Sequence, residues 1–171
     1  MTKVFLIGFM AVGKTTIGKR LANSLGISFV DLDSEIVQRE SRSINEIFEQ
    51  EGESYFRKLE SEILSEFCQG GQEMILSTGG GAPIHANNLE RMLASGTVVW
   101  LDMDREMILN RLLQSTKRPL VKDKSEDELR DFVSNHIEER IPFYQKAHFR
   151  FQSGNLTSER LAELVELVQT R

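Results

Sequence analysis

The sequence predicts an α/β protein in which helices cover a parallel sheet, and three observations lead to this prediction. An apolar segment at 4–7 is followed by a glycine-containing loop and by a segment with helical periodicity. A second short apolar segment, 27–30, follows that helix, and a strand, a helix and a strand in this order form a parallel pair with a right-handed crossover. Further apolar segments then alternate with helical patterns along the chain.

The loop after the first predicted strand, residues 8–15, has the sequence GFMAVGKT and matches the pattern G-x-x-x-x-G-K-[ST]. In such a loop, main-chain N–H groups and the N-terminus of the following helix bind phosphate. Lys14 adds a positive charge, and the Thr15 hydroxyl can bind Mg²⁺. A turn that binds nothing is the alternative interpretation, but the strand before the motif and the helix after it favour a phosphate loop.

Size and composition restrict the class of protein. A chain of 171 residues suits one domain, and its formal charge of −5 argues against general affinity for nucleic acid or anionic membranes. The single cysteine, Cys68, excludes an internal disulfide and a multi-cysteine zinc site. No apolar run approaches the length that crosses a bilayer, and no signal peptide precedes the phosphate loop, so we expect a cytoplasmic protein.

The remaining elements follow from periodicity and from residues that start or stop them. The first helix begins near Lys14 and should end at Gly26, and the second strand ends at Asp31. We expect three further strands, at 74–77, 97–101 and 148–151.

A long helical region separates the second and third strands. Ser43 and Glu46 form a capping box at its start, and the polar stretch 51–54 is the expected joint between two helices. The second helix has an apolar stripe at three- and four-residue spacing, made of Phe56, Leu59, Ile63, Leu64 and Phe67. The region is too long for a plain crossover, so we interpret it as a substrate-binding flap.

The last third of the chain contains two capped helices. A capping box at 125–128 opens a helix that should run to about Arg140, because Pro142 discourages its continuation. Thr157 is the expected cap of the last helix. The charged segment 117–124 is the best candidate for a mobile polar loop.

Polar residues or glycines follow the first four predicted strands. In a parallel sheet, ligands bind at the edge formed by the carboxyl ends of the strands. Asp31 and Asp33 follow the second strand, three glycines at 79–81 follow the third, and Asp102 follows the fourth. Asp31 and Asp102 are rival candidates for a Mg²⁺ contact, and spacing alone does not choose between them. The glycines are either a flexible turn or a place where a ligand contacts main-chain N–H groups.

Together these residues resemble the shikimate kinase family, and the resemblance covers almost the whole chain. It rests on residues 8–16, 31–33, 43–48, Gly52-Glu53, Phe56-Arg57 with Glu60, 77–82, 118–120 and 140–144. One departure is Ala11, where family members commonly have glycine, and the loop should tolerate it unless that position needs a positive φ.

The resemblance implies a three-layer α/β/α fold like that of nucleoside monophosphate kinases, with a five-stranded parallel sheet in the order 2-3-1-4-5. It implies one kinase domain over 1–171, with a substrate-binding helical region at about 33–62 and a lid at about 112–125. The implied activity transfers the γ-phosphoryl group of ATP to the 3-hydroxyl of shikimate and gives shikimate 3-phosphate, on the route to chorismate and the aromatic amino acids. The implied partners are these two small molecules, with no nucleic acid or membrane, and the implied form is a cytoplasmic monomer.

The resemblance also implies roles for single residues at the ATP end of the site. Lys14 and Arg118 would stabilise charge on the transferring phosphoryl group, and Thr15 and Asp31 would bind Mg²⁺. Arg111 and, by a looser alignment, Asn155 would contact adenine. The implied ATP-binding residues are Ala11, Val12, Gly13, Lys14, Thr15, Thr16, Arg111, Arg118 and Asn155.

At the acceptor end, Asp33 would hold the hydroxyls of shikimate and accept the proton of the attacking one. Arg57 and Arg140 would bind the carboxylate, with a further hydrogen bond from the Gly80 N–H. On the sequence alone, a simple ion pair of Arg57 with Glu53 or Glu60 on its helix is an alternative interpretation. The implied acceptor-binding residues are Asp33, Phe48, Phe56, Arg57, Gly79, Gly80, Gly81, Pro119 and Arg140.

Four competing functions are less consistent with the sequence. The carboxylate-binding arginines and the three glycines weigh against a gluconate or nucleotide kinase of the same fold. A GTP-dependent switch should carry an Asn-Lys-x-Asp motif, and a dinucleotide-binding oxidoreductase should carry G-x-G-x-x-G, and neither is present. A catalytically idle phosphate-loop protein would be indicated by loss of Lys14 or Asp33, and both are present.

Overall fold

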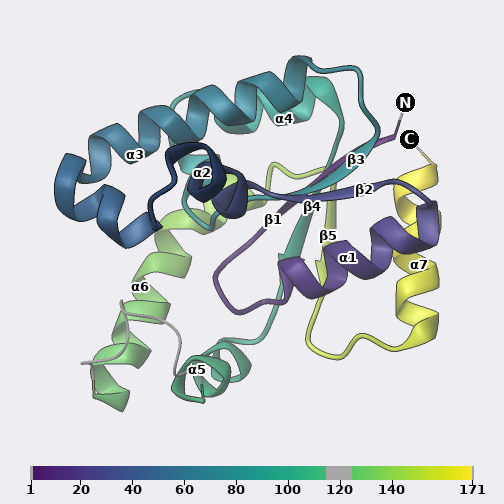
Figure 1. The fold of residues 1–171 in the computed structure, drawn as a ribbon. Helices are drawn as coiled ribbons and strands as arrows, with labels where there is room; N and C mark the ends of the chain where they lie inside the picture. Colours follow the sequence, from purple (N-terminus) through teal and green to yellow (C-terminus); the bar gives the residue numbers. More distant parts are fainter. Residues whose placement is uncertain (1, 115–124, 171) are drawn as a thin grey trace.

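The computed structural model, which describes residues 2–114 and 125–170, has a central five-stranded sheet with helices on both faces (Figure 1). All neighbouring strands are parallel, and their order is β2-β3-β1-β4-β5. The fold class and the strand order implied by the sequence are therefore confirmed. The strands are β1 (Lys3–Ile7), β2 (Ser28–Asp31), β3 (Met74–Ser77), β4 (Thr97–Asp102) and β5 (Phe149–Gln152).

Two apolar cores lie on opposite faces of the sheet, and successive residues of β1 contribute to them in turn. Val4 and Leu6 belong to one core, and Phe5 and Ile7 belong to the other. Because both faces are covered, β1 is apolar without interruption beyond Lys3. Within the described residues, no helix combines the length and the apolar character needed to cross a membrane.

The helices divide between the two faces. The first core is covered by α1 (Lys14–Leu25), α5 (Arg105–Leu113), α6 (Glu126–Tyr144) and α7 (Ser158–Gln169). The second core is covered by α2 (Leu32–Glu40), α3 (Ile44–Gln69) and α4 (Asn88–Ser95). In Figure 1, α2, α3 and α4 lie above the sheet, while α1 and α7 lie below it. A short 3₁₀ helix, η1 (Ala82–Ile84), follows β3 and its glycines.

The predicted helix boundaries are mostly confirmed. Gly26 ends α1 with a φ of 69°, and Ser43 and Ser125 form the expected capping boxes of α3 and α6. The Thr157 side chain accepts a hydrogen bond from the Arg160 N–H at the start of α7. The predicted joint is also present, because Gly52 has φ 80° and ψ 172° and interrupts α3 with a kink.

The predicted end of α6 at about Arg140 is wrong. The helix continues through Pro142 to Tyr144. Proline removes one main-chain donor, but Tyr144 is almost fully buried and its hydroxyl donates a 2.6 Å hydrogen bond to the Gly80 carbonyl oxygen. Burial and this hydrogen bond offset the lost bond, so the helix extends for another turn. This extension fixes the end of α6 against the loop that follows β3.

The predicted lid at about 112–125 lies mostly outside the described residues, which leave out 115–124. The charged segment 117–124, Arg118 and Pro119 lie outside them as well.

Candidate functional site

A cavity of about 700 Å³ lies at the carboxyl ends of β1, β2 and β3. It brings together the phosphate loop, the two aspartates after β2 and the first two glycines after β3, as the sheet topology predicts. Its lining residues are Met10, Ala11, Gly13, Lys14, Thr15, Thr16, Asp31, Asp33, Ile44, Asn45, Ser77, Thr78, Gly79, Gly80 and Arg111. Met10, Ile44, Asn45, Ser77 and Thr78 were not among the predicted site residues.

The loop at 8–15 has the features of an anion-binding cradle. Gly8 has a φ of 139°, and a Cβ atom there would lie 2.4 Å from the Leu101 carbonyl oxygen, so only glycine fits. Lys14 crosses the loop, and its Nζ donates to the carbonyl oxygens of Gly8 at 2.9 Å and Phe9 at 2.7 Å. Gly13 precedes α1 and gives no side-chain cap, so the first N–H groups of the helix remain suited to phosphate oxygens.

Ala11 adopts a backbone conformation that is unfavourable for alanine. Its φ is 65°, in the left-handed region. Position 11 therefore has the positive φ at which an alanine, unlike a glycine, is strained. The Ala11 carbonyl oxygen accepts a 2.9 Å hydrogen bond from Arg111, which holds the loop in this conformation. Because this bond uses the main chain, a glycine at position 11 would keep it.

We therefore expect Ala11→Gly to stabilise the protein. Relief of the left-handed strain, about 1–2 kcal/mol, should exceed the entropy that glycine adds to the unfolded chain, about 0.4–1 kcal/mol. Urea unfolding should show a net gain of about 0.5–1 kcal/mol, whereas a loss of stability would mean that the strain is absent. Ala22→Gly, a buried position inside α1, is the control and should lower stability.

The geometry favours Asp31 over Asp102 as the carboxylate beside the loop. The Thr15 hydroxyl donates a 3.1 Å hydrogen bond to Asp31 Oδ2. Asp102 Oδ2 instead accepts hydrogen bonds from Arg150 at 2.9 and 2.6 Å and from Gln152 at 2.7 Å. The Thr15 hydroxyl and the Asp31 carboxylate, side by side at the phosphate loop, suit Mg²⁺. This ion takes few protein ligands and completes its coordination with phosphate oxygens and water. Among the described residues, there is no group of three or more His, Cys, Asp or Glu that could hold a metal ion.

The first glycine after β3 lies against two carboxyl groups. A Cβ atom at Gly79 would be 3.0 Å from Glu60 Oε1 and 3.3 Å from Asp33 Oδ1. Asp33 belongs to the first turn of α2, while Glu60 comes from the middle of α3. The absence of a side chain at Gly79 therefore lets both carboxyl groups reach the main chain of this loop.

The next two glycines lie against the two predicted carboxylate-binding arginines. A Cβ atom would be 3.0 Å from Arg140 Nη1 at Gly80 and 2.8 Å from Arg57 Nη2 at Gly81. Arg140 also lies over the Phe9 ring, with 5.3 Å between its Cζ and the ring centroid. Two guanidinium groups from α3 and α6 thus meet on one short loop, although neither is a lining residue of the 700 Å³ cavity.

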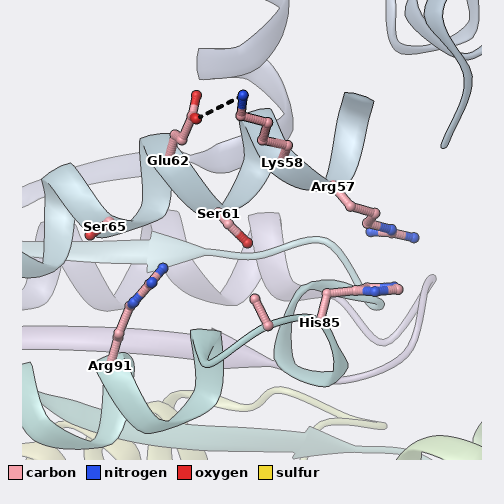
Figure 2. A pocket seen from close by; sticks show the side chains of 8 residues that line it. Arg57, Lys58, Ser61, Glu62, Ser65, His85 and Arg91 are labelled. Carbon is pink, nitrogen blue, oxygen red and sulfur yellow. Dashed lines mark ion pairs between the residues drawn. The ribbon is translucent and has the colours of Figure 1, made fainter. Parts of the chain in front are cut away.

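Arg57 also lines a second hollow, of about 420 Å³, between α3 and the segment from η1 to α4 (Figure 2). In Figure 2, Arg57 and His85 extend in the same direction, and Lys58 pairs with Glu62 on the outer face of α3. Arg57 is held by ion pairs to Glu60 at 2.9 Å and to Glu53 at 3.2 Å. Arg57 therefore forms the simple ion pairs that the sequence allowed, and it also lies beside the glycines.

The predicted aromatic wall is made by neighbouring turns of α3 on the two sides of its kink. The ring centroids of Phe48 and Phe56 are 4.8 Å apart. Arg57 Cζ lies 5.1 Å from the centroid of the Phe56 ring, so these rings lie beside one of the two arginines predicted to bind a carboxylate.

Arg111 lies beside the phosphate loop. Its Nη1 donates to the Ala11 carbonyl oxygen at 2.9 Å, and its Nη2 donates to the Gly154 carbonyl oxygen at 3.3 Å. Asn155, the next residue, is exposed. The structure therefore brings the segment around Asn155 to the phosphate loop through Arg111, without a direct contact to the cavity for Asn155 itself.

Glu60 is the main residue whose importance at the site the sequence analysis missed. It is 0% exposed, and its Oε1 atom has no hydrogen-bond partner among the described residues. Burial raises the pKa of its carboxyl to about 7, against the opposing effect of Arg57. The sequence analysis named Glu60 as part of the family resemblance and as an ion-pair partner of Arg57, but it did not predict the burial of this carboxyl. The available signal was a charged residue next to the apolar stripe of α3.

The raised pKa predicts a pH-dependent stability. Between pH 4.5 and 7, the folded protein holds the Glu60 proton while the unfolded chain loses it, so stability should fall as pH rises through this range. The unaltered chain should lose about 2 kcal/mol of unfolding free energy between pH 5 and pH 8, at about 1.4 kcal/mol per pKa unit. We expect Glu60→Gln not to show this loss. Urea unfolding at both pH values measures it. Glu62→Gln, an exposed change on the same helix, should run parallel to the unaltered chain, and parallel behaviour of Glu60→Gln would refute the assignment.

The comparisons with known proteins agree with one another. A family model described as shikimate kinase matches residues 10–169. A shikimate kinase from Azobacteroides pseudotrichonymphae is 43% identical over 164 residues, which cover 95% of this chain and 96% of the relative. The crystal structure of shikimate kinase from Bacteroides thetaiotaomicron has a TM-score of 0.91 and 36% identity, covering 99% of this chain and 97% of that one. Shikimate kinase from Acinetobacter baumannii in complex with shikimate has a TM-score of 0.88 and 32% identity, covering 99% and 94%.

Proposed function

The chain belongs to the shikimate kinase family, whose members are ATP-dependent kinases, and on this premise we propose that it transfers the γ-phosphoryl group of ATP to the 3-hydroxyl of shikimate. One observation carries the proposal at the level of residues. The phosphate loop, Asp33 and the first two of the three glycines, Gly79 and Gly80, line the same cavity, and the Asp33 carboxyl lies beside Gly79. A phosphoryl donor and an alcohol acceptor therefore have adjacent places at one edge of the sheet.

At the donor end, the loop N–H groups and α1 bind the phosphates, and Lys14 stabilises the charge that develops on the transferring group. Its present hydrogen bonds to loop carbonyl oxygens keep Nζ at the cradle. Arg118, which lies outside the described residues, adds a second positive charge. Val12, Gly13 and Thr16 complete the loop, while Arg111 and Asn155 lie on the adenine side.

Thr15 and Asp31 would hold Mg²⁺, which neutralises negative charge on the donor phosphates when bound. Their 3.1 Å hydrogen bond supports this assignment, because it places two oxygen ligands side by side at the cradle.

At the acceptor end, Arg57 and Arg140 bind the carboxylate of shikimate, assisted by the Gly80 N–H. The contacts of both guanidinium groups with the glycine loop support this orientation. Phe48 and Phe56, together with Pro119 outside the described residues, border the ring of the substrate. Glu60 holds Arg57 through their 2.9 Å ion pair.

In the chemical step, Asp33 accepts the proton of the 3-hydroxyl as its oxygen attacks the γ-phosphorus. The bond between the γ-phosphorus and the bridging oxygen breaks, and ADP leaves. The position of Asp33 at Gly79 supports this role, since the acceptor hydroxyl would lie between Asp33 and the donor phosphates. Residues 1–171 form one kinase domain in this proposal, with 33–62 as the acceptor-binding region and 112–125 as the lid, and it works as a cytoplasmic monomer without nucleic acid or membrane.

A coupled ADP-release assay tests the proposed function. Shikimate should support ADP release with kcat/KM at least about 100-fold above the other acceptors, because quinate carries an extra hydroxyl on a saturated ring carbon, gluconate is an open chain and nucleoside monophosphates lack the carboxylate. Equal or faster turnover with any of these other acceptors would contradict the proposal. Omission of Mg²⁺ should abolish turnover with shikimate, and full activity in the presence of a chelator would remove the metal from the account.

A further inference from the structure

Residues 44–51 form a separate segment of α3 that contributes directly to the cavity. Ile44 and Asn45 line it, and the Phe48 ring packs at a tilt against the Phe56 ring across the kink. The kink at Gly52 separates this segment from the rest of α3, and the turn at 41–43 separates it from α2. Ile47 anchors the middle of this segment in the second core, so the position of its bent ends depends on further contacts.

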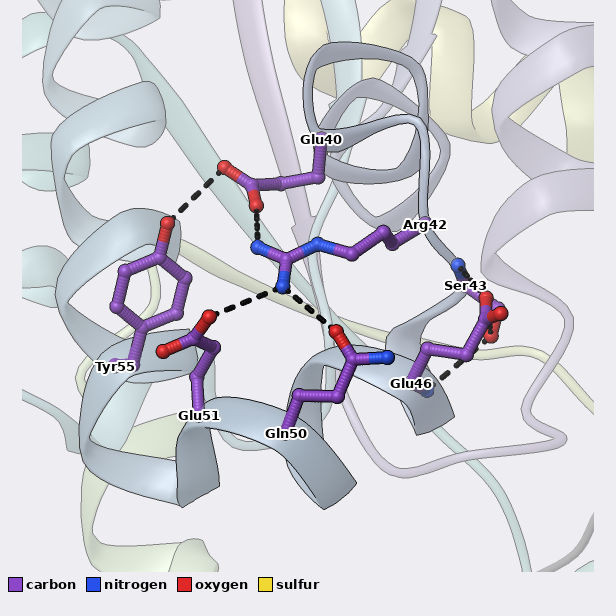
Figure 3. A network of polar contacts seen from close by, with 7 residues as sticks. All are labelled: Glu40, Arg42, Ser43, Glu46, Gln50, Glu51 and Tyr55. Atoms are coloured by element: carbon purple, nitrogen blue, oxygen red, sulfur yellow. Dashed lines mark hydrogen bonds and ion pairs between the residues drawn. The ribbon is translucent and has the colours of Figure 1, made fainter.

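A polar cluster joins the C-terminal end of the segment to the end of α2 (Figure 3). Arg42 donates from Nη1 to Gln50 Oε1 at 3.0 Å and to Glu51 Oε1 at 3.1 Å, and from Nη2 to Glu40 Oε2. On the far side of the kink, the Tyr55 hydroxyl donates to Glu40 Oε1 at 3.2 Å. Arg42 therefore connects the last residue of α2 to the last two residues of the segment, and Glu40 connects them to the helix beyond Gly52.

The pair of Arg42 with Glu40 at the centre of the cluster is partly shielded from water, while the hydrogen bonds from Arg42 to Gln50 and Glu51 are exposed. The side chains of Arg42 and Glu40 are 26% and 16% exposed. The hydrogen bond from Arg42 lowers the pKa of the Glu40 carboxyl, so Glu40 is ionised at neutral pH. A single planar guanidinium reaches three acceptors here, which a lysine ammonium at the end of a flexible stem does not reproduce with the same geometry.

We propose that Arg42 is a positioning residue for the acceptor, which fixes the 44–51 segment as one wall of the acceptor pocket. Arg42 itself does not line the cavity, so it acts through Ile44, Asn45 and Phe48. The inference rests on the proposed function, because it assigns the segment to shikimate rather than to ATP. It predicts that loss of the cluster weakens binding of the acceptor and leaves the ATP end unchanged.

The test compares Arg42→Gln with Arg39→Gln. Arg39 also connects α2 to α3, through Glu66 at 2.7 Å, but it does so beyond the kink and far along the helix from the segment. We expect Arg42→Gln to raise KM for shikimate about tenfold, with kcat and KM for ATP within about twofold of the unaltered chain. Arg39→Gln should leave all three constants within about twofold. Arg42→Lys should give an intermediate KM.

Hydrogen exchange on the protein without substrates supplies a second readout that does not depend on the reaction. Amides of 44–52 should exchange about tenfold faster in Arg42→Gln and at an unchanged rate in Arg39→Gln. Unchanged exchange, an unchanged KM for shikimate, or a parallel rise in both KM values would overturn the inference. Failure of the unaltered chain to use shikimate would instead overturn the proposed function, while the exchange experiment would still decide whether Arg42 fixes the segment.

Discussion

Asp33→Asn is expected to lower kcat by about 10³-fold while the Kd for ATP changes by less than about twofold. The amide keeps the size of the side chain and its ability to hydrogen bond, but it does not accept the proton of the attacking hydroxyl, a contribution of about 10²–10⁴-fold in enzymes. Asp33 lines the cavity beside Gly79, on the side that we propose for the acceptor, so the phosphate cradle should be unaffected. Single-turnover kinetics with saturating ATP and shikimate, together with ATP titration calorimetry, measure the two quantities.

Glu35→Gln is the matched control for Asp33. Glu35 belongs to the same helix, but its carboxyl pairs with Arg39 away from the cavity. Its replacement should leave kcat within about twofold, in line with the small contribution of partly exposed ion pairs. An Asp33→Asn enzyme that retained more than about a tenth of the normal kcat would remove Asp33 as the proton acceptor.

Lys14→Met is expected to lower kcat by about 10²–10³-fold, the usual effect of removing one donor that stabilises transition-state charge. This corresponds to about 3–4 kcal/mol of lost stabilisation. The substitution keeps the length of the aliphatic chain but removes the hydrogen bonds from Nζ to the Gly8 and Phe9 carbonyl oxygens. Steady-state kinetics at varied ATP should therefore show a moderate increase in KM for ATP and a much larger fall in kcat.

Lys19→Met is the matched control for Lys14→Met. It tests whether the effect depends on a positive charge at the phosphate loop or on any positive charge on α1. Lys19 is on the same helix, with its Nζ 6.0 Å from the centroid of the Phe29 ring. Its loss should leave both constants nearly unchanged. If Lys14→Met and Lys19→Met gave the same kinetics, the role assigned to Lys14 would be contradicted.

Structural features that depend on residues close together in the sequence were predictable. The phosphate loop, the capping boxes at Ser43 and Ser125, and the break at Gly52 each depend on residues within a few positions of one another. The strand order was implied only by the family resemblance, but the meeting of the strand-end residues followed from parallel topology alone.

Features that depend on packing between distant elements were not predictable. The end of α6 was placed too early because the rule for Pro142 does not include the burial of Tyr144 against Gly80. Glu60 was undervalued because its burial depends on which face of α3 meets the glycine loop. The cluster around Arg42 forms only when α2 and α3 fold back on each other, so no local sequence pattern predicts it.

The central claim is that one edge of the sheet holds the donor phosphates and a carboxylate-bearing alcohol face to face. A crystal structure with shikimate and ADP tests it most directly. The account predicts the shikimate carboxylate within hydrogen-bonding distance of Arg57 and Arg140, and the 3-hydroxyl between Asp33 and the phosphate loop. Shikimate bound with its carboxylate away from both arginines, or with its 3-hydroxyl out of reach of Asp33, would contradict the account.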